Sequence, residues 1–519
     1  MSGAVTVNWT PLDRLLTFGS PARARRRYSD KVVFATMQRG YEAARRGRGT
    51  DGWHTPGTSA DAEIGAAGAL LRNRMRDLVR NNPLAAQAVQ VLVNNIVGTG
   101  IRPRSAGKVK STNKKVDAAW ARWQARCDAH GHTDFHGLTA LAVREMIEGG
   151  DLFALRRFTG PRGRGSLRMQ VELREADHLD DAKFETREGG ARIRQGIETD
   201  AQGRRTAFWM FPDHPGDRDP IFGRRFESMR LPANGVAHLF ERQRTQARGV
   251  PWGVAAMRSL RDIDDWQHAE LVRKKTEACL VGISVQDDMD GVTSTDGAAA
   301  GLNAITDAQG NLIEQFSPGM IGYSRGAGDF KFNQPSSAGG VAEWYRVQQH
   351  VVAAGFRVPY ALMTGDLSQT NFSSSRVGLN EFRRMVELMQ WHVVIPMFCA
   401  RVWDWFIEAA ILSGELPEGD YPVEWAPPRF EAVNPLQDAQ ADVWEVRAGF
   451  STRSQMIAKR GYDPQDVLAE WAADAKAADA EDLIFDTDPR RATRVGVHQG
   501  EDAPGKTEPG TDRTPVGDT

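Results

Sequence analysis

The stretch FRVPYALMTGDLSQTNFSSSRVGLNEFRR (residues 356–384) joins two helical patterns through a loop of short polar side chains. Residues 349–355 (QHVVAAG) predict a helix end, Pro359 stops that helix, and Gly365-Asp366 signals a turn. Ser368-Gln369-Thr370-Asn371 and Ser373-Ser374-Ser375 follow, and their side chains form hydrogen bonds without carrying charge. No catalytic motif explains this loop, and its chemistry suits a surface past which another molecule slides.

Long helices are predicted on both sides of the loop. One runs from about Arg376 to Leu412 and is bent at Pro396, because a proline inside a helix removes one backbone hydrogen bond and clashes with the preceding turn. Helical spacing predicts the remaining helices: two over residues 61–97, interrupted at Asn81-Asn82-Pro83, two over 116–149, a long amphipathic one over about 255–280, and others after Pro435 and Ser451.

The region between residues 151 and 240 has a different texture. Runs at 167–173, 206–211 and 236–240 alternate or cluster apolar residues between Gly, Pro and Asp turns, which predicts the strands of a small mixed sheet. Residues 282–340 return to Gly- and Asp-rich turns and predict an inserted lobe. The expected fold class is therefore α+β and mainly helical.

Size and charge bound the function. A chain of 519 residues holds several modules, and 41% hydrophobic with 26% charged residues is typical of a soluble globular protein. A formal net charge of −1 argues against a protein that coats nucleic acid through bulk positive charge. Residues 1–110 nevertheless carry 18 Lys/Arg against 7 Asp/Glu, whereas residues 463–519 carry 6 against 14. The basic arm fits nucleic acid, an acidic partner or simple solvation equally well.

Compartment signals point to a reducing cytoplasm. The three cysteines, Cys127, Cys279 and Cys399, are widely separated and suggest neither a disulfide framework nor a zinc site. The N-terminus lacks the apolar core of a signal peptide. The most apolar window, residues 393–412, contains Arg401, Asp404 and Glu408, so we expect a buried or interface helix and no membrane contact.

Several motifs are better explained without catalysis. Residues 500–507 spell a Walker A motif, but Pro509-Gly510 follows at once where a helix is required. His130, His132 and His136 have irregular spacing and no second ligand cluster, so we expect no metal site. Asp287, Asp288 and Asp290 fit an exposed acidic loop better than a Mg²⁺ site, and Asp262, Asp264 and Asp265 are expected to pair with nearby arginines or lysines. Neither G-x-S-x-G nor H-E-x-x-H occurs, and we expect no catalytic residue and no cofactor.

Several strings, in order, resemble the lambda-type portal proteins of tailed phages. The strings are RDLVRNNPLAAQAV (76–89), NNIVGTGIRPR (94–104), EADHLD (175–180), RGVPWGVAAMRSLRDIDDWQHAEL (248–271), SPGMIGY (317–323) and GDLSQTNFSSSR (365–376). The resemblance runs from about residue 10 to residue 480. It implies a portal-type fold with wing, stem, clip and crown regions around a central channel.

Composition predicts the arm and the tail, and the resemblance implies how the chain between them is divided. The regions are a basic, partly disordered arm (1–60), a wing of helices and a small mixed sheet (61–254), a stem helix (255–280), a clip (281–340), a second stem helix (341–356), a tunnel loop (357–375), a long kinked helix (376–413), a helical crown (414–483) and a disordered tail (484–519). Arg357 stands where many relatives have Gly, which would put a cation beside the channel.

The implied function is a ring, usually of twelve copies, at one capsid vertex, through which genomic DNA enters and later leaves. Implied partners are duplex DNA held without sequence preference, the terminase large subunit, the major capsid protein and a head–tail adaptor. The protein would assemble in the host cytoplasm and reside in the virion. The channel residues would be Arg357, Ser368, Gln369, Thr370, Asn371, Ser373, Ser374, Ser375 and Arg376, and the clip would dock terminase or adaptor through Asp287, Asp288 and Asp290.

Elementary physics agrees with a channel, because each neutralised phosphate adds affinity that would stall a moving polyanion. Ring closure needs one surface patch to meet a different patch on the neighbour, for which Trp391, Trp403 and Trp405 are candidates, although an intrachain core explains them equally well. Two other functions stay open. One is a DNA-processing enzyme of the packaging machinery, an ATPase or nuclease, and the other is a scaffold ring that never touches DNA.

Overall fold

The computed structural model describes residues 23–29, 57–159, 167–217, 227–279, 284–286, 323–325, 340–368, 372–428, 430, 435–460, 462, 464–483 and 485. The chain divides into two compact units, Met1–Ala62 and Glu63–Thr519, and we call the second the main unit. In the first unit residues 23–29 are helical. Most of the predicted arm and clip, the Walker-like string and the predicted tail from residue 486 lie outside the described residues.

Helices dominate the described chain, as the sequence predicts. They are α3 (Ala60–Asn81), α4 (Pro83–Ile96), α5 (Lys110–Gln124), α6 (Phe135–Gly149), α7 (Met257–Cys279), α8 (Val341–Phe356), α9 (Tyr360–Thr364), α10 (Phe372–Met389), the π-helix η7 (Gln390–Cys399), α11 (Ala400–Ser413), α12 (Pro435–Arg447), α13 (Arg453–Lys459) and α14 (Pro464–Ala480). Short 3₁₀ turns are η3 (Ala176–His178), η4 (Glu188–Gly190), η5 (Ala233–Gly235) and η6 (Trp252–Ala255).

The predicted interruption after α3 is confirmed and has a local cause. The Asn82 side chain accepts hydrogen bonds from the backbone N–H groups of Leu84 (3.0 Å) and Ala85 (3.3 Å), and Pro83 occupies the first helical position. An N-cap of this kind satisfies donors that have no partner inside the helix, and proline at the next position loses no bond. The helix that follows, α4, is largely buried and contacts α6, α9 and α10.

The prediction of a mixed sheet is wrong, because the strands of residues 151–240 form two antiparallel sheets. One has the order β3-β2-β9, built from β2 (Asp151–Phe158), β3 (Met169–Glu175) and β9 (Val236–Phe240). The other runs in sequence order through β4 (Glu185–Thr186), β5 (Arg192–Arg194), β6 (Ile197–Thr199), β7 (Arg205–Met210) and β8 (Met229–Pro232). Connections of two to five residues join β4, β5, β6 and β7 in turn, and such short connections cannot make the crossover that parallel pairing requires.

Two further strand pairs lie outside these sheets. β1 (Arg102–Ser105) pairs antiparallel with β12 (Val423–Ala426), more than 300 residues later in the chain. β10 (Ser284–Gln286) and β11 (Tyr323–Arg325) form a parallel pair within the predicted clip. The β1–β12 pair therefore connects the start of the predicted wing to the segment that follows α11.

An aromatic cluster forms the centre of the main hydrophobic core. Trp120 lies 4.8 Å from Trp123 and 5.1 Å from Phe135, Trp403 and Phe406, measured between ring centroids. These rings come from α5, α6 and α11, so the cluster joins the predicted wing to the long helix. Such rings bury large apolar areas and prefer tilted or edge-to-face contacts. A smaller core, which includes Phe153 and Phe208, lies between the two antiparallel sheets.

The three tryptophans that the sequence offered as contacts between subunits of a ring differ in exposure. Trp403 and Trp405 are each 2% exposed, so the intrachain-core interpretation holds for both. The Trp405 indole donates a hydrogen bond to the Asn234 carbonyl at 2.7 Å. Trp391, by contrast, is 48% exposed. It remains available for contact with another molecule.

The sequence predicts one long helix bent at Pro396, and the structure has a π-helical segment at that place and an earlier helix start. α10 starts at Phe372 rather than near Arg376, and a π-helical segment containing Pro396 separates α10 from α11. Proline lacks the N–H that the helical ladder needs and clashes with the preceding turn, and a π segment is another form of helix irregularity. The buried Gln390 side chain in this segment donates to the carbonyl of Ile96 at 2.8 Å, at the end of α4. One side chain thus joins the long helix to the opening helices.

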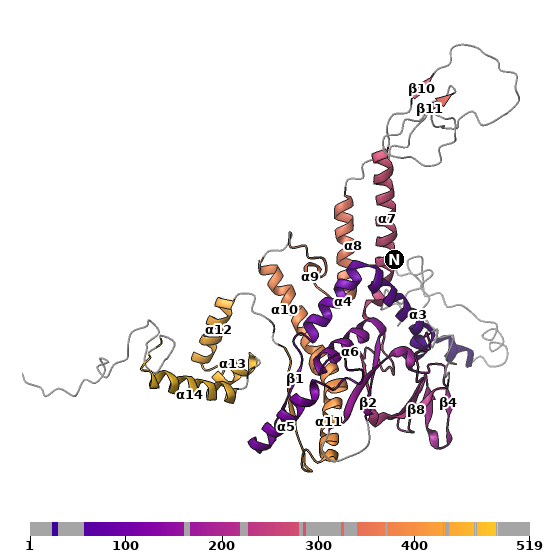
Figure 1. Ribbon diagram of the computed structural model, residues 1–519. Helices are drawn as coiled ribbons and strands as arrows, with labels where there is room; N and C mark the ends of the chain where they lie inside the picture. The colour runs from indigo at the N-terminus through magenta and orange to yellow at the C-terminus, as the bar shows by residue number, and fades with distance from the viewer. Residues whose placement is uncertain are drawn as a thin grey trace, which may run out of the picture. The chain divides into compact units, whose positions relative to one another are not determined.

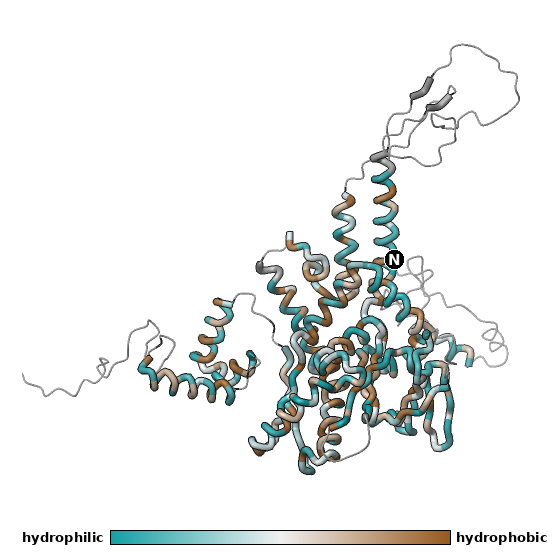
Figure 2. Tube along the Cα trace, in the orientation of Figure 1, coloured by the Kyte–Doolittle hydropathy of each residue, from teal (hydrophilic) through white to brown (hydrophobic). Residues whose placement is uncertain are grey.

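Helices α7 and α8, the predicted stem, run side by side away from the rest of the main unit (Figure 1). Trp266 lies 4.5 Å from Trp344 between ring centroids, and Gln267 donates to the Tyr345 hydroxyl at 2.5 Å. Figure 2 shows hydrophilic and hydrophobic residues in alternation along both helices. Arg258–Asp262 (3.9 Å) and Arg261–Asp265 (3.3 Å) are ion pairs one turn apart, which confirms the predicted pairing for those two aspartates.

Helices α12, α13 and α14 form the predicted C-terminal helical region. The three contain no buried residue in the described structure. A capping box between Thr452 and Gln455 starts α13. No described helix is both long enough and apolar enough to cross a membrane.

Candidate functional site

The candidate site is the segment from the end of α8 to the start of α10, which contains the predicted tunnel loop. α8 ends at Phe356, and Arg357 adopts the left-handed conformation (φ 60°, ψ 31°). The Arg357 N–H bonds back to the carbonyls of Ala353 and Ala354, and the Val358 N–H bonds to Ala353. This is the usual way to end a helix, and glycine is the usual residue there because a side chain makes the conformation costly.

The Arg357 side chain has two partners that the sequence could not reveal. Its guanidinium forms an ion pair with Glu241 at 2.6 Å and lies over the Trp252 ring, 5.0 Å from the centroid. Glu241 follows β9 and Trp252 begins η6, so both belong to the connection between the predicted wing and α7. The cation that the sequence placed beside a channel is therefore neutralised against that connection. These two interactions offset the cost of a non-glycine residue at this position.

We expect substitutions at Arg357 to separate the backbone cost from the side-chain interactions. Arg357→Ala keeps the strained backbone and removes both interactions, whereas Arg357→Gly removes the interactions together with the strain. The alanine variant should therefore be less stable than the glycine variant by about 1 kcal/mol. Urea unfolding followed by tryptophan fluorescence measures the difference. Equal stability of the two variants would show that the left-handed conformation carries no cost here.

Beyond Pro359, the short helix α9 is fixed by hydrogen bonds of its first residue. The Tyr360 hydroxyl donates to Asp366 at 3.0 Å, and the Tyr360 ring stacks on His350 of α8 with 4.1 Å between centroids. Asp366 also accepts the Ser368 backbone N–H at 2.9 Å. Hydrogen bonds from Ser368 and Tyr360 lower the pKa of Asp366, while burial and the Asp366 carboxylate raise the pKa of Tyr360. Asp366 is thus an ionised carboxylate that fixes the turn.

The structure places only part of the predicted channel set in a loop. Ser368 is exposed, beside Leu367, which is 65% exposed. Gln369, Thr370 and Asn371 lie outside the described residues, as do Asp287, Asp288 and Asp290 of the predicted clip. The backbone of Ser373, Ser374 and Ser375 belongs to the first turn of α10, so the prediction that these serines belong to the loop is wrong. Serine favours helix starts as readily as turns, which is why the pattern was ambiguous.

Arg376, the last residue of the predicted set, forms an ion pair with Asp438 of α12 at 3.0 Å. Residues of α10 and α12 also line a cavity of about 730 Å³, to which Trp391 and Tyr462 contribute. Arg376 therefore connects the start of the long helix to the C-terminal helices.

A buried charge network fixes the connection from which α7 leaves. Asp151, the first residue of β2, is 1% exposed and accepts hydrogen bonds from Arg248 (2.5 Å), the Gly249 N–H (2.5 Å) and His238 (2.9 Å). The Arg248 charge and these hydrogen bonds hold the pKa of Asp151 well below its usual range despite full burial. The other ring nitrogen of His238 faces Arg205 at 2.8 Å and accepts a hydrogen bond from it.

His238 is consequently neutral in the folded chain. Burial lowers its pKa to about 4, and the Arg205 and Arg248 charges act in the same direction against the opposing effect of Asp151. The backbone is equally constrained, because a Cβ on Gly249 would lie 2.0 Å from the Gly150 carbonyl oxygen. Sequence reasoning missed this network, since Asp151 and His238 lie on different strands and no local motif links them.

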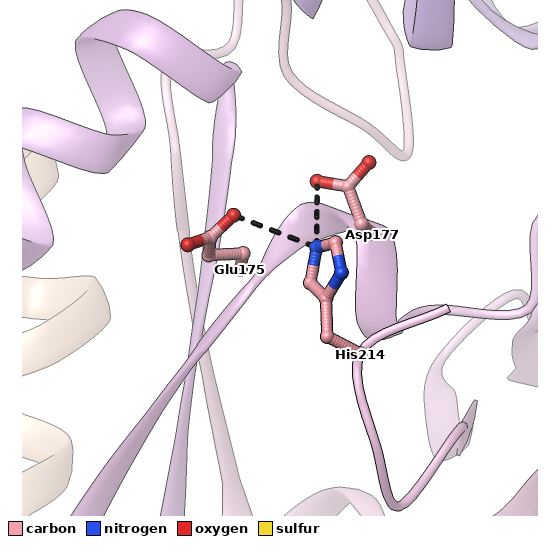
Figure 3. A group of neighbouring side chains, drawn as sticks. All are labelled: Glu175, Asp177 and His214. Atoms are coloured by element: carbon pink, nitrogen blue, oxygen red, sulfur yellow. Dashed lines mark ion pairs between the residues drawn. The ribbon is translucent and has the colours of Figure 1, made fainter. Parts of the chain in front are cut away.

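A second cluster contains groups that could hold a metal ion. Among the described residues, Glu175, Asp177 and His214 offer ligand atoms within 4.8 Å of one another (Figure 3). Arg76 occupies the same carboxylates, at 2.7 Å from both Glu175 and Asp177. Arg76 also pairs with Glu145 at 2.5 Å, and burial raises the pKa of Glu145 to about 8. The arrangement is a charge network that joins α3 and α6 to β3, because a guanidinium already supplies the positive charge that a metal would bring.

The histidines singled out in the sequence belong to a capped turn. Asp128 accepts the backbone N–H groups of His130 (3.0 Å), His132 (2.8 Å) and Thr133 (3.2 Å). The His130 and His132 rings stack with 6.4 Å between centroids, and among the described residues neither shares a group of candidate metal ligands with His136. The helix-to-helix connection expected from the sequence is what the structure contains.

Comparisons with known proteins agree with the resemblance noted in the sequence. A sequence profile described as "Phage portal protein, lambda family" matches residues 46–390, more than half of the chain. The chain is 25% identical over 470 residues to a probable portal protein of Halomonas phage phiHAP-1, covering 85% of this chain and 87% of the relative. It is 22% identical over 474 residues to portal protein B of Escherichia phage lambda, covering 80% and 85%. A solved chain from the neck of an empty GTA particle is similar over 79% of this chain and 95% of its own, with 14% identity and a TM-score of 0.40.

Proposed function

The chain belongs to the lambda family of phage portal proteins, and on that premise we propose that its copies close into a ring at one capsid vertex. In this proposal the ring encloses the channel through which duplex DNA is packaged and ejected. The observation that carries it is the segment after α9, in which Leu367 and Ser368 are exposed to solvent and carry no charge. A polyanion slides past such a surface because no phosphate is held strongly.

The charges near this segment support the same function. Arg357 and Arg376, the two cations of the predicted channel set, are each neutralised by a carboxylate of another element, Glu241 and Asp438. Asp366 is half-exposed, and its carboxylate accepts hydrogen bonds from the Tyr360 hydroxyl and the Ser368 N–H. What remains exposed at Ser368 is neutral and polar. A loop of this kind lets DNA move past it and is poorly suited to binding a ligand.

Uncovered apolar stripes on two helices support assembly with further copies. On α8, Trp344, Val347 and Val351 are 40%, 57% and 47% exposed at helical spacing. On α10 and the segment after it, Val377, Leu388 and Trp391 are 71%, 51% and 48% exposed. Apolar stripes on helices normally face a partner. We assign them to contacts between neighbouring copies of the ring, with twelve copies as the expected number.

The remaining partners follow from the proposed role. The clip, residues 281–340 with Asp287, Asp288 and Asp290, would dock the terminase large subunit during packaging and a head–tail adaptor afterwards. The wing would meet the major capsid protein. The ring would assemble in the host cytoplasm and remain at the portal vertex of the virion. The protein would act without catalysis, as a structural conduit.

Purified full-length protein tests the ring. Native mass spectrometry should show a species many times the 57.3 kDa of one chain, and negative-stain images should show a central hole. ATP hydrolysis should be absent, and Lys506→Ala should change nothing. A compact monomer would overturn the proposal, and an ATPase activity that disappears in the Lys506 variant would favour the packaging enzyme instead.

A charge placed in the segment tests whether DNA passes it. In Ser368→Lys particles, packaging should slow at low salt and recover at high salt, because each ammonium within about 4 Å of a phosphate adds about 1 kcal/mol of attraction in water, roughly a fivefold longer dwell. Packaged genome length per unit time measures the effect. Ser368→Asn, neutral and polar, is the matched control. An unchanged packaging rate in the lysine variant would favour a scaffold ring that never touches DNA.

A further inference from the structure

A cluster of lysines stands apart from every site described above. Residues 102–116 contain six basic residues and no Asp or Glu. Four of them, Lys108, Lys110, Lys114 and Lys115, are exposed on the loop before α5 and on its first turns, and we call them the lysine patch. Lys110 and Lys114 are one helical turn apart, about 6 Å along the axis.

The backbone under the lysine patch is firmly held. Asn113 donates to the Gly107 carbonyl at 2.8 Å and its other side-chain atom meets the Ser105 hydroxyl at 3.2 Å. The first carboxylate that follows, Asp117, accepts the Ser105 N–H at 2.9 Å and is directed to the backbone. The Ala106 N–H bonds to the Pro422 carbonyl at 2.8 Å, beyond the β1–β12 pair. The patch is therefore a set of charges on a fixed platform.

No ion pair within the described residues includes a lysine of the patch. Many arginines elsewhere are paired, for example Arg76 with Asp177, Arg122 with Glu415 and Arg248 with Asp151. Cations near the first turn of a helix also oppose the helix dipole. The fold gains nothing from this concentration of charge, which points to an anion outside the chain.

We infer that the lysine patch binds the phosphate backbone of duplex DNA on a surface outside the channel. A channel must release phosphates, whereas clustered, unpaired ammonium groups hold them. Figure 1 draws α5, whose first turns carry most of the patch, at the end of the main unit opposite to the one from which α7 and α8 extend. All four members of the patch are lysines, and none is an aromatic or amide side chain that would contact base edges. Binding is therefore independent of DNA sequence. The choice of duplex DNA as the polyanion rests on the proposed function.

Covalently closed circular duplex DNA is the probe that separates this surface from the channel, because a closed circle cannot thread a ring. Full-length protein is titrated with a labelled minicircle at several salt concentrations. The variant Lys108→Gln, Lys110→Gln, Lys114→Gln, Lys115→Gln should bind at low salt roughly tenfold or more weakly than the unmodified chain. The slope of log affinity against log salt should become shallower by about 0.9 for each phosphate that the variant no longer neutralises.

A matched control removes four positive charges elsewhere. Arg74, Arg80, Arg192 and Arg194 are exposed arginines on α3 and β5, and their replacement by Gln should leave minicircle binding nearly unchanged. A variant with arginine at all four patch positions should bind like the unmodified chain. This result would show that the DNA responds to the positive charge and not to lysine itself. Melting curves confirm that every variant is folded.

Three results would overturn the inference. The first is that the unmodified chain does not bind the minicircle. The second is that the glutamine variant of the patch binds the minicircle as tightly as the unmodified chain. The third is that the patch variant and the control variant lose affinity equally. A patch variant with normal minicircle binding but an altered number of subunits would assign the surface to an acidic face of a neighbouring copy. Failure of the channel function is distinguishable, since it would leave minicircle binding intact while Ser368→Lys had no effect on packaging.

Discussion

Replacing Asp151 by Ala is expected to lower the free energy of unfolding by about 3–5 kcal/mol, the cost of breaking a buried ion pair by removing one partner. The substitution leaves the Arg248 guanidinium, itself 4% exposed, without a counter-charge in the protein interior. It also leaves the Gly249 N–H and a ring nitrogen of His238 without their acceptor. The connection between β9 and α7 should loosen, so the predicted stem would lose its fixed direction.

Urea unfolding at a fixed subunit concentration measures this effect, because assembly would otherwise shift the apparent stability. The cluster of Trp120, Trp123 and Trp403 in the main core provides the fluorescence signal. Asp181→Ala, an exposed aspartate of the same region, is the control and should change stability by less than about 0.5 kcal/mol. If the unfolding free energy of the Asp151→Ala variant lies within about 1 kcal/mol of that of the unmodified chain, the network does not stabilise the fold as its burial indicates.

Acidification is expected to destabilise the protein through His238. The pKa of this imidazole is lowered to about 4 in the folded chain, against an ordinary value of 6.5. A histidine of this kind stabilises the fold fully above pH 6.5, and the contribution is lost as the pH falls towards 4, because the unfolded chain takes up the proton first. The loss is about 3 kcal/mol at most. Asp151, whose pKa is also lowered, adds a further loss at still lower pH.

Unfolding free energies measured between about pH 4 and pH 7 for the unmodified chain and for His238→Gln isolate this contribution. Lowered pKa values of His136 and His178 act in the same direction, and the raised pKa of Glu145 acts in the opposite direction between about pH 4.5 and 8. These groups are common to both proteins, so the difference between the two pH profiles reports His238. Parallel profiles would show that the imidazole does not titrate between its folded and unfolded values.

The sequence predicted those elements whose cause is local. The end of α3 follows from Asn82 and Pro83, whose capping bonds involve neighbours two and three residues away. The irregular segment of the long helix contains Pro396, which the interior of a regular helix does not accommodate. The turn after α9 follows from Gly365, which adopts φ 73°. The lysine patch was not singled out in the sequence, because its meaning depends on exposure and on the absence of ion-pair partners within the described residues.

Predictions failed where a local pattern permits two structures. Alternation of apolar residues indicates a strand but not the direction of its partner, so the wing sheets were expected to be mixed and are antiparallel. Three consecutive serines fit a turn or a helix start, and the structure chose the helix. Tryptophans were assigned to a core or to a ring contact with equal reason, and burial decided for Trp403 and Trp405 in favour of the core.

By itself the sequence determined the mainly helical α+β class, the existence of the long helices and the neutral polar character of the segment before α10, because these depend on spacing and side-chain type along a few residues. Tertiary structure alone decided that Arg357 is neutralised by Glu241 and that Asp151 joins His238, Arg248 and Gly249. Those partners are 87 to 116 residues apart. Each of these charges depends on a distant partner because both are buried in the same interior, where an unpaired charge is costly. No periodicity in the sequence indicates such a pairing.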